Sequence, residues 1–343
     1  MKYLIYTDCH FSQYSSIVRT RGKKYSTRLE NLIRSISWAE HLADEQNCDE
    51  VFCLGDFFDR PELGPEELTA LQDVYFSNKP HTFLTGNHDA NISSLEFSSV
   101  QIFKSIRAEI ITDIVKKEIN DKVDFYFIPY ISEGKPKKLK EIISGNKKKV
   151  VFSHNDLAGI KYGKFISQSG FNIKDVLENC TLFLNGHLHN GCVIEDRIVL
   201  VGNLTGQNFN EDATRYDHYA YILEVLEDGS ITLEPHINPC AFNFYKLSIA
   251  KKEDMQILNN LKNNAVLSIS CASKLIQEVT QLLSTKKNIV DYRLVTLYAN
   301  SATQTEVVDF KVEDHLQQFI EYVQTKIQPS EILSDELTRL SKA

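Results

Sequence analysis

Long hydrophobic runs, internal repeats and paired cysteines are missing from this sequence of 343 residues. No uninterrupted apolar stretch approaches the roughly 18 residues that a membrane span requires, and the first residues become polar too early for a secretory signal. The chain has only 14 Gly and 8 Pro, which excludes collagen-like, low-complexity and wholly disordered proteins. We therefore expect a globular cytoplasmic protein that does not contact a membrane.

Cysteine is present without a pairing pattern. The chain has 7 Cys, an odd number, and no two of them have Cys-x-x-Cys spacing. Neither a disulfide framework nor a zinc knuckle is indicated. We expect buried thiols in a reducing compartment.

An excess of positive charge is also absent. The chain has 38 Lys and Arg against 46 Asp and Glu, a net charge of −8. This balance argues against a surface covered in basic patches for nucleic acid. Local basic clusters and bound metal ions can offset an acidic total, so composition alone leaves the function open.

Short apolar runs alternate with helical patterns over the first two thirds of the chain. Expected strands cover 2–7, 51–54, 81–84, 123–128, 150–152 and 181–184, and expected helices cover about 26–46, 66–76 and 135–143. Thr27 and Glu30 have capping-box spacing at the start of the first helix. Two hairpins should turn near 195–196 and 228–229. This order predicts an α/β sandwich.

The character of the sequence changes near Pro239. Further strands are expected at 245–249, 266–270 and 291–297, with helices near 253–261 and 274–283, which together make a small βαβαβ domain. An apolar stripe then predicts a helix over 312–327. We divide the chain into a first domain of residues 1–240, an accessory domain of 241–300 and a helical tail of 301–343.

Polar clusters follow five of the expected strands, each at the point where a strand ends. In chain order they are Asp8-x-His10, Gly55-Asp56-x-x-Asp59-Arg60, Gly86-Asn87-His88-Asp89, His154 and Gly186-His187-x-His189. Strand ends are where an α/β sheet gathers ligands from distant parts of the chain. Carboxylate, imidazole and amide groups suit divalent ions such as Mn, Fe or Zn without any thiolate.

The number of candidate ligands is sufficient for two metal ions. One ion would be held by Asp8, His10, Asp56 and His189, and the other by Asp56, Asn87, His154 and His187. Asp56 would then bridge the ions at the separation of about 3.5–4 Å found in two-metal hydrolytic sites. In-line hydrolysis of a phosphoester suits such a site, and His88 is the candidate donor of a proton to the leaving oxygen.

Taken in this order, the motifs resemble those of the calcineurin-like metallophosphoesterase superfamily over roughly residues 1–210. The resemblance implies an αββα sandwich with a small C-terminal α/β capping domain. It implies two divalent metal ions, for which we take Mn²⁺ first and Mg²⁺, Fe²⁺ or Zn²⁺ as alternatives. It also implies that Asp59 orients and charges His88.

Within that superfamily the chain most resembles the SbcD-type nuclease subunit of the SbcC–SbcD DNA repair complex and its phage counterparts. The resemblance rests on Asp8-x-His10 at the extreme N-terminus, the Gly-Asp-x-Phe-Asp motif at 55–59 and the small α/β domain that follows. It implies a DNA nuclease, exonuclease or endonuclease, that forms a homodimer in a bacterial or phage-infected cytoplasm. The implied partner is an SbcC-like coiled-coil ATPase, which we expect to dock on the tail at 301–343. The segment 202–206 departs from the Gly-Ser-Pro loop common in bacterial members.

Basic residues follow the first motif. Arg19, Arg21, Lys23 and Lys24 lie in one loop, and Arg60 belongs to the second motif. Phosphate contacts dominate nucleic-acid affinity, so these residues are candidates to bind DNA, with a merely solvated loop as the equal alternative.

Two other functions remain open. One is a metal-dependent protein phosphatase or small-molecule phosphodiesterase, and the other is a non-catalytic scaffold that binds a partner. The intact set of metal ligands argues against the scaffold. The accessory domain and the basic loop favour the nuclease.

Overall fold

Two six-stranded sheets form the centre of the first 240 residues in the computed structural model, which describes residues 1–19, 21–91, 94–131, 138–162 and 165–297. The first sheet contains β1 (Lys2–Tyr6), β2 (Glu50–Cys53), β3 (His81–Leu84), β4 (Glu109–Ile111), β15 (Tyr219–Val225) and β16 (Ile231–Ile237). Its order is β16-β15-β1-β2-β3-β4, with β1 to β4 parallel and the β15–β16 hairpin antiparallel.

The second sheet also has six strands, with an antiparallel strand at each edge. It contains β5 (Val115–Glu118), β6 (Val123–Ile128), β7 (Lys148–Ser153), β12 (Leu182–Asn185), β13 (Cys192–Ile194) and β14 (Ile198–Leu200). Its order is β13-β14-β12-β7-β6-β5, and the four inner strands are parallel. The two hairpins expected near 195–196 and 228–229 are both present.

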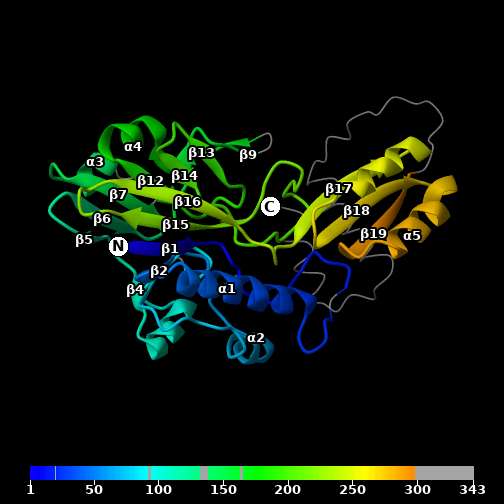
Figure 1. Cartoon of the computed structure of the whole chain (residues 1–343), viewed down its shortest axis with the longest axis horizontal. Coiled ribbons are helices and arrows are strands. Elements are labelled where there is room, and N and C mark those ends of the chain that lie inside the picture. The colour runs from blue at the N-terminus through cyan, green and yellow to red at the C-terminus, as the bar shows by residue number, and fades with distance from the viewer. Residues whose placement is uncertain (20, 92–93, 132–137, 163–164, 298–343) are drawn as a thin grey trace, which may run out of the picture. The chain divides into compact units, whose positions relative to one another are not determined.

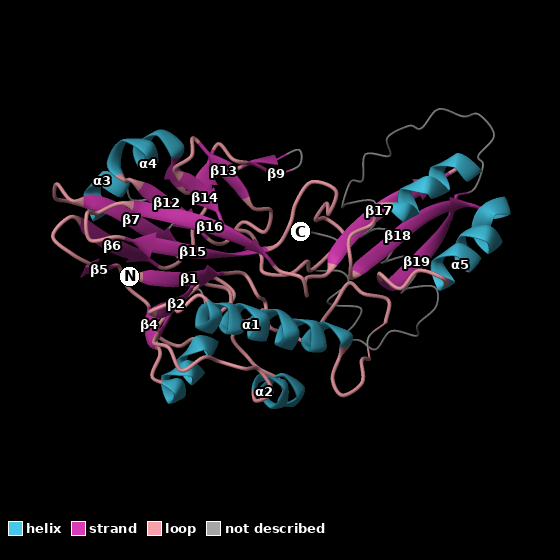
Figure 2. Ribbon diagram, in the orientation of Figure 1, coloured by secondary structure: helices cyan, strands magenta, loops and turns pink. Residues whose placement is uncertain are grey.

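Helices cover the outer face of each sheet (Figures 1 and 2). On the first sheet lie α1 (Thr27–Glu45), α2 (Pro65–Leu71) and the 3₁₀ helix η1 (Ser99–Ile106), and on the second lie α3 (Leu139–Ile142) and α4 (Ile173–Asn179). Tyr3 and Ile5 pack between the sheets, whereas Leu4 and Tyr6 pack against α1. Both faces of the inner strands are therefore buried, which explains their continuous apolar sequences. The expected αββα sandwich is confirmed.

The start of α1 corrects one expectation. Ser26, with an extended backbone, is the N-cap, and its hydroxyl accepts a hydrogen bond from the Leu29 amide at 3.2 Å. The Glu30 carboxylate accepts instead from the Lys24 amide, at 2.7 Å. The predicted capping box at Thr27 was wrong, because Thr27 is already the first residue of the helix and Leu29, three residues after the N-cap, has no carboxylate.

Two helices are shorter than expected. The helix expected at 66–76 ends at Leu71, after which 3₁₀-type turns run to Val74. Of the helix expected at 135–143, the structure has α3 alone, and residues 135–137 lie outside the described residues. Four two-residue strands connect β7 to α4: β8 (Leu157–Ala158), β9 (Lys161–Tyr162), β10 (Phe165–Ile166) and β11 (Phe171–Asn172).

A parallel three-stranded sheet follows the sandwich. It contains β17 (Asn243–Ile249), β18 (Ala265–Ala272) and β19 (Ile289–Leu297) in that order, with α5 (Ile276–Ser284) and the 3₁₀ helices η2 (Lys252–Asn259) and η3 (Ser273–Leu275) as connections. The first connection is 3₁₀ rather than the expected α-helix. The tail at 301–343 lies outside the described residues.

The cysteines correct another expectation. All seven are free thiols, and Cys9, Cys48, Cys53, Cys180 and Cys271 are buried as expected. Cys192, however, is exposed. Within the described residues, no helix has the length and apolar character needed to cross a membrane.

Candidate metal centre

The candidate metal ligands lie at the carboxyl ends of five parallel strands, three in the first sheet and two in the second. They are Asp8 and His10 after β1, Asp56 after β2, Asn87 after β3, His154 after β7, and His187 and His189 after β12, and the candidate proton donor His88 follows Asn87. All of these strand ends point to the same side of the sandwich, so residues 179 positions apart in the sequence, such as Asp8 and His187, meet there.

Three overlapping groups of ligand atoms form at these strand ends. Within each group, all ligand atoms lie within 4.8 Å of one another. The groups are Asp8–His10–His189, His10–Asp56–His88 and Asp56–His154–His187. Asn87 reaches the third group, since its Oδ1 lies 3.0 Å from the His187 Nδ1. The structure thus brings together all seven residues that we assigned to two metal ions.

The negative charges of the buried carboxylates must be balanced by nearby positive charge. Burial raises the pKa of Asp56, but the neighbouring imidazoles, His154 foremost, outweigh burial and hold that pKa well below its usual range. Burial lowers the pKa of His154, but Asp56, with its Oδ2 3.1 Å from the His154 Nε2, raises it to about 9. Protonated imidazoles can supply this positive charge, and so can divalent cations.

The contacts at the centre fit metal ions better than protons. The Oδ1 of Asp8 is buried without a hydrogen-bond partner, and the Nε2 atoms of His10 and His189 face each other at 3.1 Å. An unpartnered buried carboxylate oxygen carries a desolvation cost that a cation removes. The donor set of carboxylate, imidazole and amide therefore fits two divalent ions.

The backbone is strained at the centre. Asp8, His10, Asp56 and His187 have φ values of 49°, 47°, 50° and 71°, in the left-handed region. Asp and His tolerate this region better than most residue types, but each such residue still costs free energy. Main-chain hydrogen bonds hold the strained loops together, for example from the His10 amide to the Asp56 carbonyl at 3.0 Å.

Two glycines allow the strand ends to approach one another. A Cβ on Gly86 would lie 2.1 Å from the Asp56 Oδ1, and a Cβ on Gly55, whose φ is +101°, would lie 2.3 Å from the His154 Nδ1. Neither position has room for a side chain. The glycines in the motifs are therefore required by packing against the candidate ligands.

Hydrogen bonds orient the candidate ligands. The His154 Nδ1 donates to the Leu54 carbonyl at 2.6 Å, which fixes the tautomer and turns Nε2 toward Asp56. Thr7 donates its hydroxyl to the Asp8 Oδ2 at 2.7 Å, and the His187 amide donates to the same oxygen at 2.9 Å. Such contacts hold metal ligands in position.

His88 and Asp59 meet differently from the expectation. The His88 Nδ1 donates to the main-chain carbonyl of Asp59 at 2.9 Å, while the Asp59 Oδ1 lies 3.3 Å from the His10 Nδ1. The main chain of Asp59 thus orients His88. The carboxylate of Asp59 instead favours the protonated form of His10. Among the residues of the three ligand groups, His88 is the exposed one.

Sequence reasoning missed three carboxylates that support the centre. Glu211 lies 3.3 Å from the His189 Nδ1, and Asp156 lies 3.3 Å from the His187 Nε2. Asp89 is fully buried and accepts hydrogen bonds from the amides of Phe58 and Gly86, each at 2.9 Å. Asp89 stands in a recognised motif and could have been found there. Glu211 carries no local signal, because it lies 22 residues from His189.

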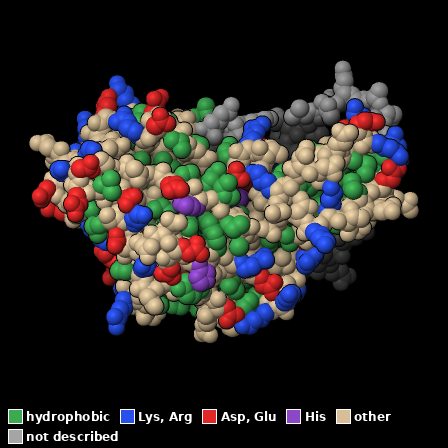
Figure 3. Space-filling model, in the orientation of Figure 1, with side chains coloured by type: hydrophobic (Ala, Val, Ile, Leu, Met, Phe, Trp, Pro, Cys, Tyr) green, Lys and Arg blue, Asp and Glu red, His purple; other side chains and the backbone are tan. Residues whose placement is uncertain are grey.

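The basic loop is mostly paired with acids. Arg21 lies 2.8 Å from Glu66, Lys24 lies 2.5 Å from Asp73, and Arg60 lies 2.7 Å from Glu67. Arg19 donates to the Val290 carbonyl at 2.9 Å and contacts Asp291, while Lys23 is exposed. The face drawn in Figure 3 carries Lys and Arg side chains interspersed with Asp and Glu. These pairings reduce the positive charge that the loop can offer to DNA.

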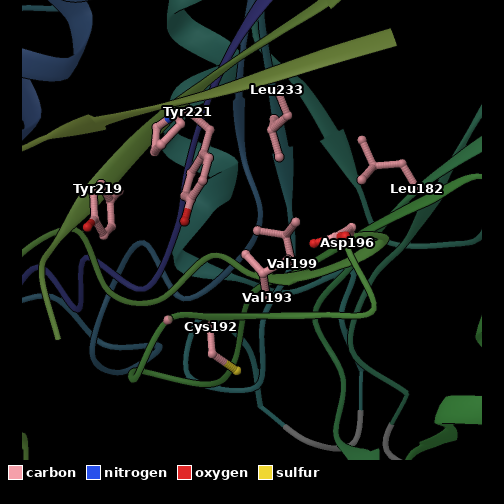
Figure 4. A pocket seen from close by; sticks show the side chains of 10 residues that line it. Leu182, Cys192, Val193, Asp196, Val199, Tyr219, Tyr221 and Leu233 are labelled. Carbon is pink, nitrogen blue, oxygen red and sulfur yellow. The ribbon is translucent and has the colours of Figure 1, made fainter. Parts of the chain in front are cut away.

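A cavity of about 400 Å³ lies away from these residues, between edge strands of the two sheets (Figure 4). Its walls are mainly apolar, with Tyr221 and Leu233 from the first sheet and Leu182, Val193 and Val199 from the second. None of the candidate ligands lines it. We therefore assign the chemistry to the residues at the strand ends and not to this cavity.

Comparisons with solved structures found distant similarities. A dimetal phosphatase from Danio rerio is 12% identical, with a TM-score of 0.42, over 69% of this chain and 96% of that one. The protein TT1561 of Thermus thermophilus is 11% identical, with a TM-score of 0.38, over 68% and 98%. The phosphoesterase Yfce from E. coli is 11% identical, with a TM-score of 0.28, over 69% and 100%.

A comparison with curated proteins found no match. The family model for calcineurin-like phosphoesterases matches residues 1–228, which include every candidate ligand and the whole αββα sandwich up to β15. Members of this family hydrolyse phosphoesters with the help of two divalent metal ions. The chain belongs to the calcineurin-like phosphoesterase family and is a metal-dependent phosphoesterase.

Proposed function

We propose that this protein is a two-metal-dependent DNA nuclease, the nuclease subunit of an SbcC–SbcD-like repair or recombination complex. The observation that carries the proposal is the parallel sheet β17-β18-β19 placed directly after the sandwich. It contacts the loop after the first motif, since the Arg19 guanidinium donates to the Val290 carbonyl. A domain beside the loop that borders the metal centre suits a polymer substrate.

In this proposal two ions would be held by the seven residues that we assigned as ligands. One ion would bind Asp8, His10, Asp56 and His189, and the other would bind Asp56, Asn87, His154 and His187. When bound, such ions lower the pKa of water and neutralise phosphate oxygens. We propose Mn²⁺ first, with Mg²⁺, Fe²⁺ or Zn²⁺ as alternatives.

His88 is proposed to protonate the leaving oxygen. A carbonyl oxygen can only accept, so the contact with Asp59 keeps a proton on the His88 Nδ1 and leaves Nε2 to exchange protons with the substrate. The His88 amide also donates to the Asp56 Oδ1 at 2.8 Å, which fixes the backbone beside the centre. A positioned imidazole of this kind contributes about 10²–10⁴-fold to a rate.

The alternative is a small-molecule phosphodiesterase or a protein phosphatase. The pairing of Arg21, Lys24 and Arg60 with carboxylates favours it, because these residues then add little net charge for a DNA backbone.

The test is incubation with linear duplex and single-stranded DNA in Mn²⁺, with and without a chelator, and a reading of product sizes. The nuclease proposal expects chelator-sensitive shortening of the DNA. A phosphomonoester and a phosphoprotein are assayed beside it. Cleavage of these alone, with intact DNA, would contradict the nuclease and favour the alternative.

A further inference from the structure

A polar cavity of about 310 Å³ adjoins the candidate metal centre on the side of His10. Its size is at the lower end of the range for small-molecule sites. Six of the residues that line it are His10, Ser12, Tyr14, Arg28, Asp59 and Gln207. Because His10 belongs to two of the three ligand groups, a molecule in this cavity lies next to the reacting phosphate.

Tyr14 presents a flat aromatic surface at this cavity. Its side chain is 64% exposed, which is unusual for a large apolar ring. The Arg60 guanidinium lies 4.7 Å from the ring centroid, so one ring face is backed by a cation. Among the described residues, no other aromatic ring stacks on Tyr14.

The support behind Tyr14 is rigid. The Arg60 Nη2 lies 2.7 Å from the Glu67 Oε2, and the Glu67 side chain is only 1% exposed. The same carboxylate accepts hydrogen bonds from the amides of Gln13, at 3.0 Å, and Gly64, at 2.7 Å. One buried Glu therefore fixes both Arg60 and the main chain beside Tyr14. The ring is held in place before any ligand arrives.

A buried cation lies in the wall of the same cavity. Arg28 is 3% exposed, and its guanidinium donates to the carbonyls of Cys9 at 3.1 Å and Gly206 at 2.7 Å. Among the described residues, no carboxylate forms an ion pair with it. The carboxylates of Glu211 and Asp59 offset part of its positive charge from a greater distance, and the rest can attract an anion that enters the cavity.

An aromatic face, a cation and hydroxyl and amide groups in one small cavity are the features that recognise a nucleotide. We propose that this cavity binds the nucleotide unit next to the scissile phosphate, with its base stacked on Tyr14. The inference rests on the proposed nuclease function and specifies its substrate contact. Stacking is tolerant of sequence, because every base has a π face.

The experiment measures whether the effect of Tyr14 on kcat/KM depends on the presence of a base next to the scissile phosphate. Each substrate is a single-stranded oligonucleotide with one ordinary phosphodiester among nuclease-resistant linkages. The flanking nucleotides are normal, abasic on the 5′ side or abasic on the 3′ side. We compare kcat/KM in Mn²⁺ for wild type, Tyr14→Ala and Tyr14→Phe. The matched control is Tyr75→Ala, because Tyr75 is also exposed and stacked, on His41, but does not line the cavity.

On the normal substrate, Tyr14→Ala should lower kcat/KM by roughly 5- to 150-fold, the range for the loss of one base–aromatic stack. Tyr14→Phe should restore most of the activity, and Tyr75→Ala should behave as wild type. On one of the two abasic substrates, the difference between wild type and Tyr14→Ala should disappear.

Two results would overturn the inference while leaving the nuclease intact. One is a Tyr14→Ala enzyme as active as wild type, and the other is an equal loss on the normal and both abasic substrates. Failure of the wild type to cleave any oligonucleotide, despite turnover of a small phosphoester, would instead refute the proposed function. Because Tyr14 is exposed, its variants should keep the wild-type unfolding temperature.

Discussion

The surrounding fold holds four residues of the metal centre in a strained backbone conformation. They are Asp8, His10, Asp56 and His187. Left-handed residues persist only where the surrounding structure determines them, and here buried sheets hold both sides of each loop. Asp8 is buried against His187 through a hydrogen bond of 2.9 Å from the His187 amide to its Oδ2. The free energy lost to strain is recovered by the rest of the sandwich. The geometry of the centre therefore exists before a substrate binds.

Replacement of His88 should impair the chemical step without loss of bound metal. His88→Ala should keep its metal content but lose about 10²–10⁴-fold of kcat, because the imidazole is proposed to donate a proton and is not among the assigned ligands. Metal analysis and kinetics on the same preparation measure both. His41→Ala, at another exposed histidine, is the control. A His88→Ala enzyme with unimpaired turnover would refute the role.

Glu211 is expected to act through His189. Its Oε1 lies 3.3 Å from the His189 Nδ1, and its Oε2 accepts the Gln207 amide at 2.8 Å. Glu211→Gln should weaken metal affinity by about 10–100-fold, and excess Mn²⁺ should restore activity. Glu234→Gln is a matched control, since Glu234 pairs with His236 at 3.6 Å, outside the ligand groups. Equal metal affinity in both variants would show that Glu211 has only a structural role.

Between elements, one buried ion pair joins α1 to β3. The Glu40 Oε2 lies 3.0 Å from the His81 Nε2, and the same carboxylate accepts hydrogen bonds from Tyr6 and Ser77. Burial lowers the pKa of His81, but the bond to Glu40 outweighs burial and the pKa is raised. The helix and the strand are therefore linked by a contact that depends on protonation.

This pair predicts a pH dependence of stability. A raised folded pKa means that its contribution is fully present below the ordinary histidine pKa of about 6.5 and is lost as pH rises through the folded pKa. His81→Gln should therefore destabilise the protein most at about pH 6, by on the order of 1.5–3 kcal/mol, and progressively less toward about pH 9. Thermal unfolding of both proteins across this range measures it. A difference independent of pH would show that His81 is not charged in the fold.

Elements with a strong local signal could be predicted from the sequence. The inner strands were readable because both of their faces are buried, which leaves continuous apolar runs such as residues 51–54. The candidate ligands were readable because the chain places Asp8, Asp56 and Asn87 directly after such runs. The connection at Lys252–Asn259 looked helical, but it is a 3₁₀ helix, a distinction that side-chain periodicity over eight residues does not carry.

Contacts between distant residues could not be predicted. Arg28 meets Gly206 across 178 positions, and Arg19 meets Val290 across 271. No local pattern marks these pairs, because each partner is ordinary in its own segment. For the same reason the salt bridges of Arg21 and Lys24, which change the interpretation of the basic loop, came only with the structure.

At the scale of the whole molecule, residues 1–297 form one compact unit. Deletion of 301–343 should therefore leave a folded, metal-loaded enzyme that still cleaves small phosphodiesters. In the proposed complex it should no longer co-purify with an SbcC-like ATPase or respond to ATP. Pull-down and ATP-dependent nuclease assays measure this. Undiminished binding of the ATPase to the truncated protein would place the docking surface elsewhere.

The central claim is a two-metal centre joined by Asp56, and metal content per chain tests it most directly. Mass spectrometry of the Mn²⁺-loaded protein should find two ions per chain in the wild type. Asp56→Asn should lose bound metal and hydrolytic activity together, while Asp121→Asn, at an exposed position away from the centre, should match the wild type. An Asp56→Asn protein that keeps two ions per chain would contradict the account.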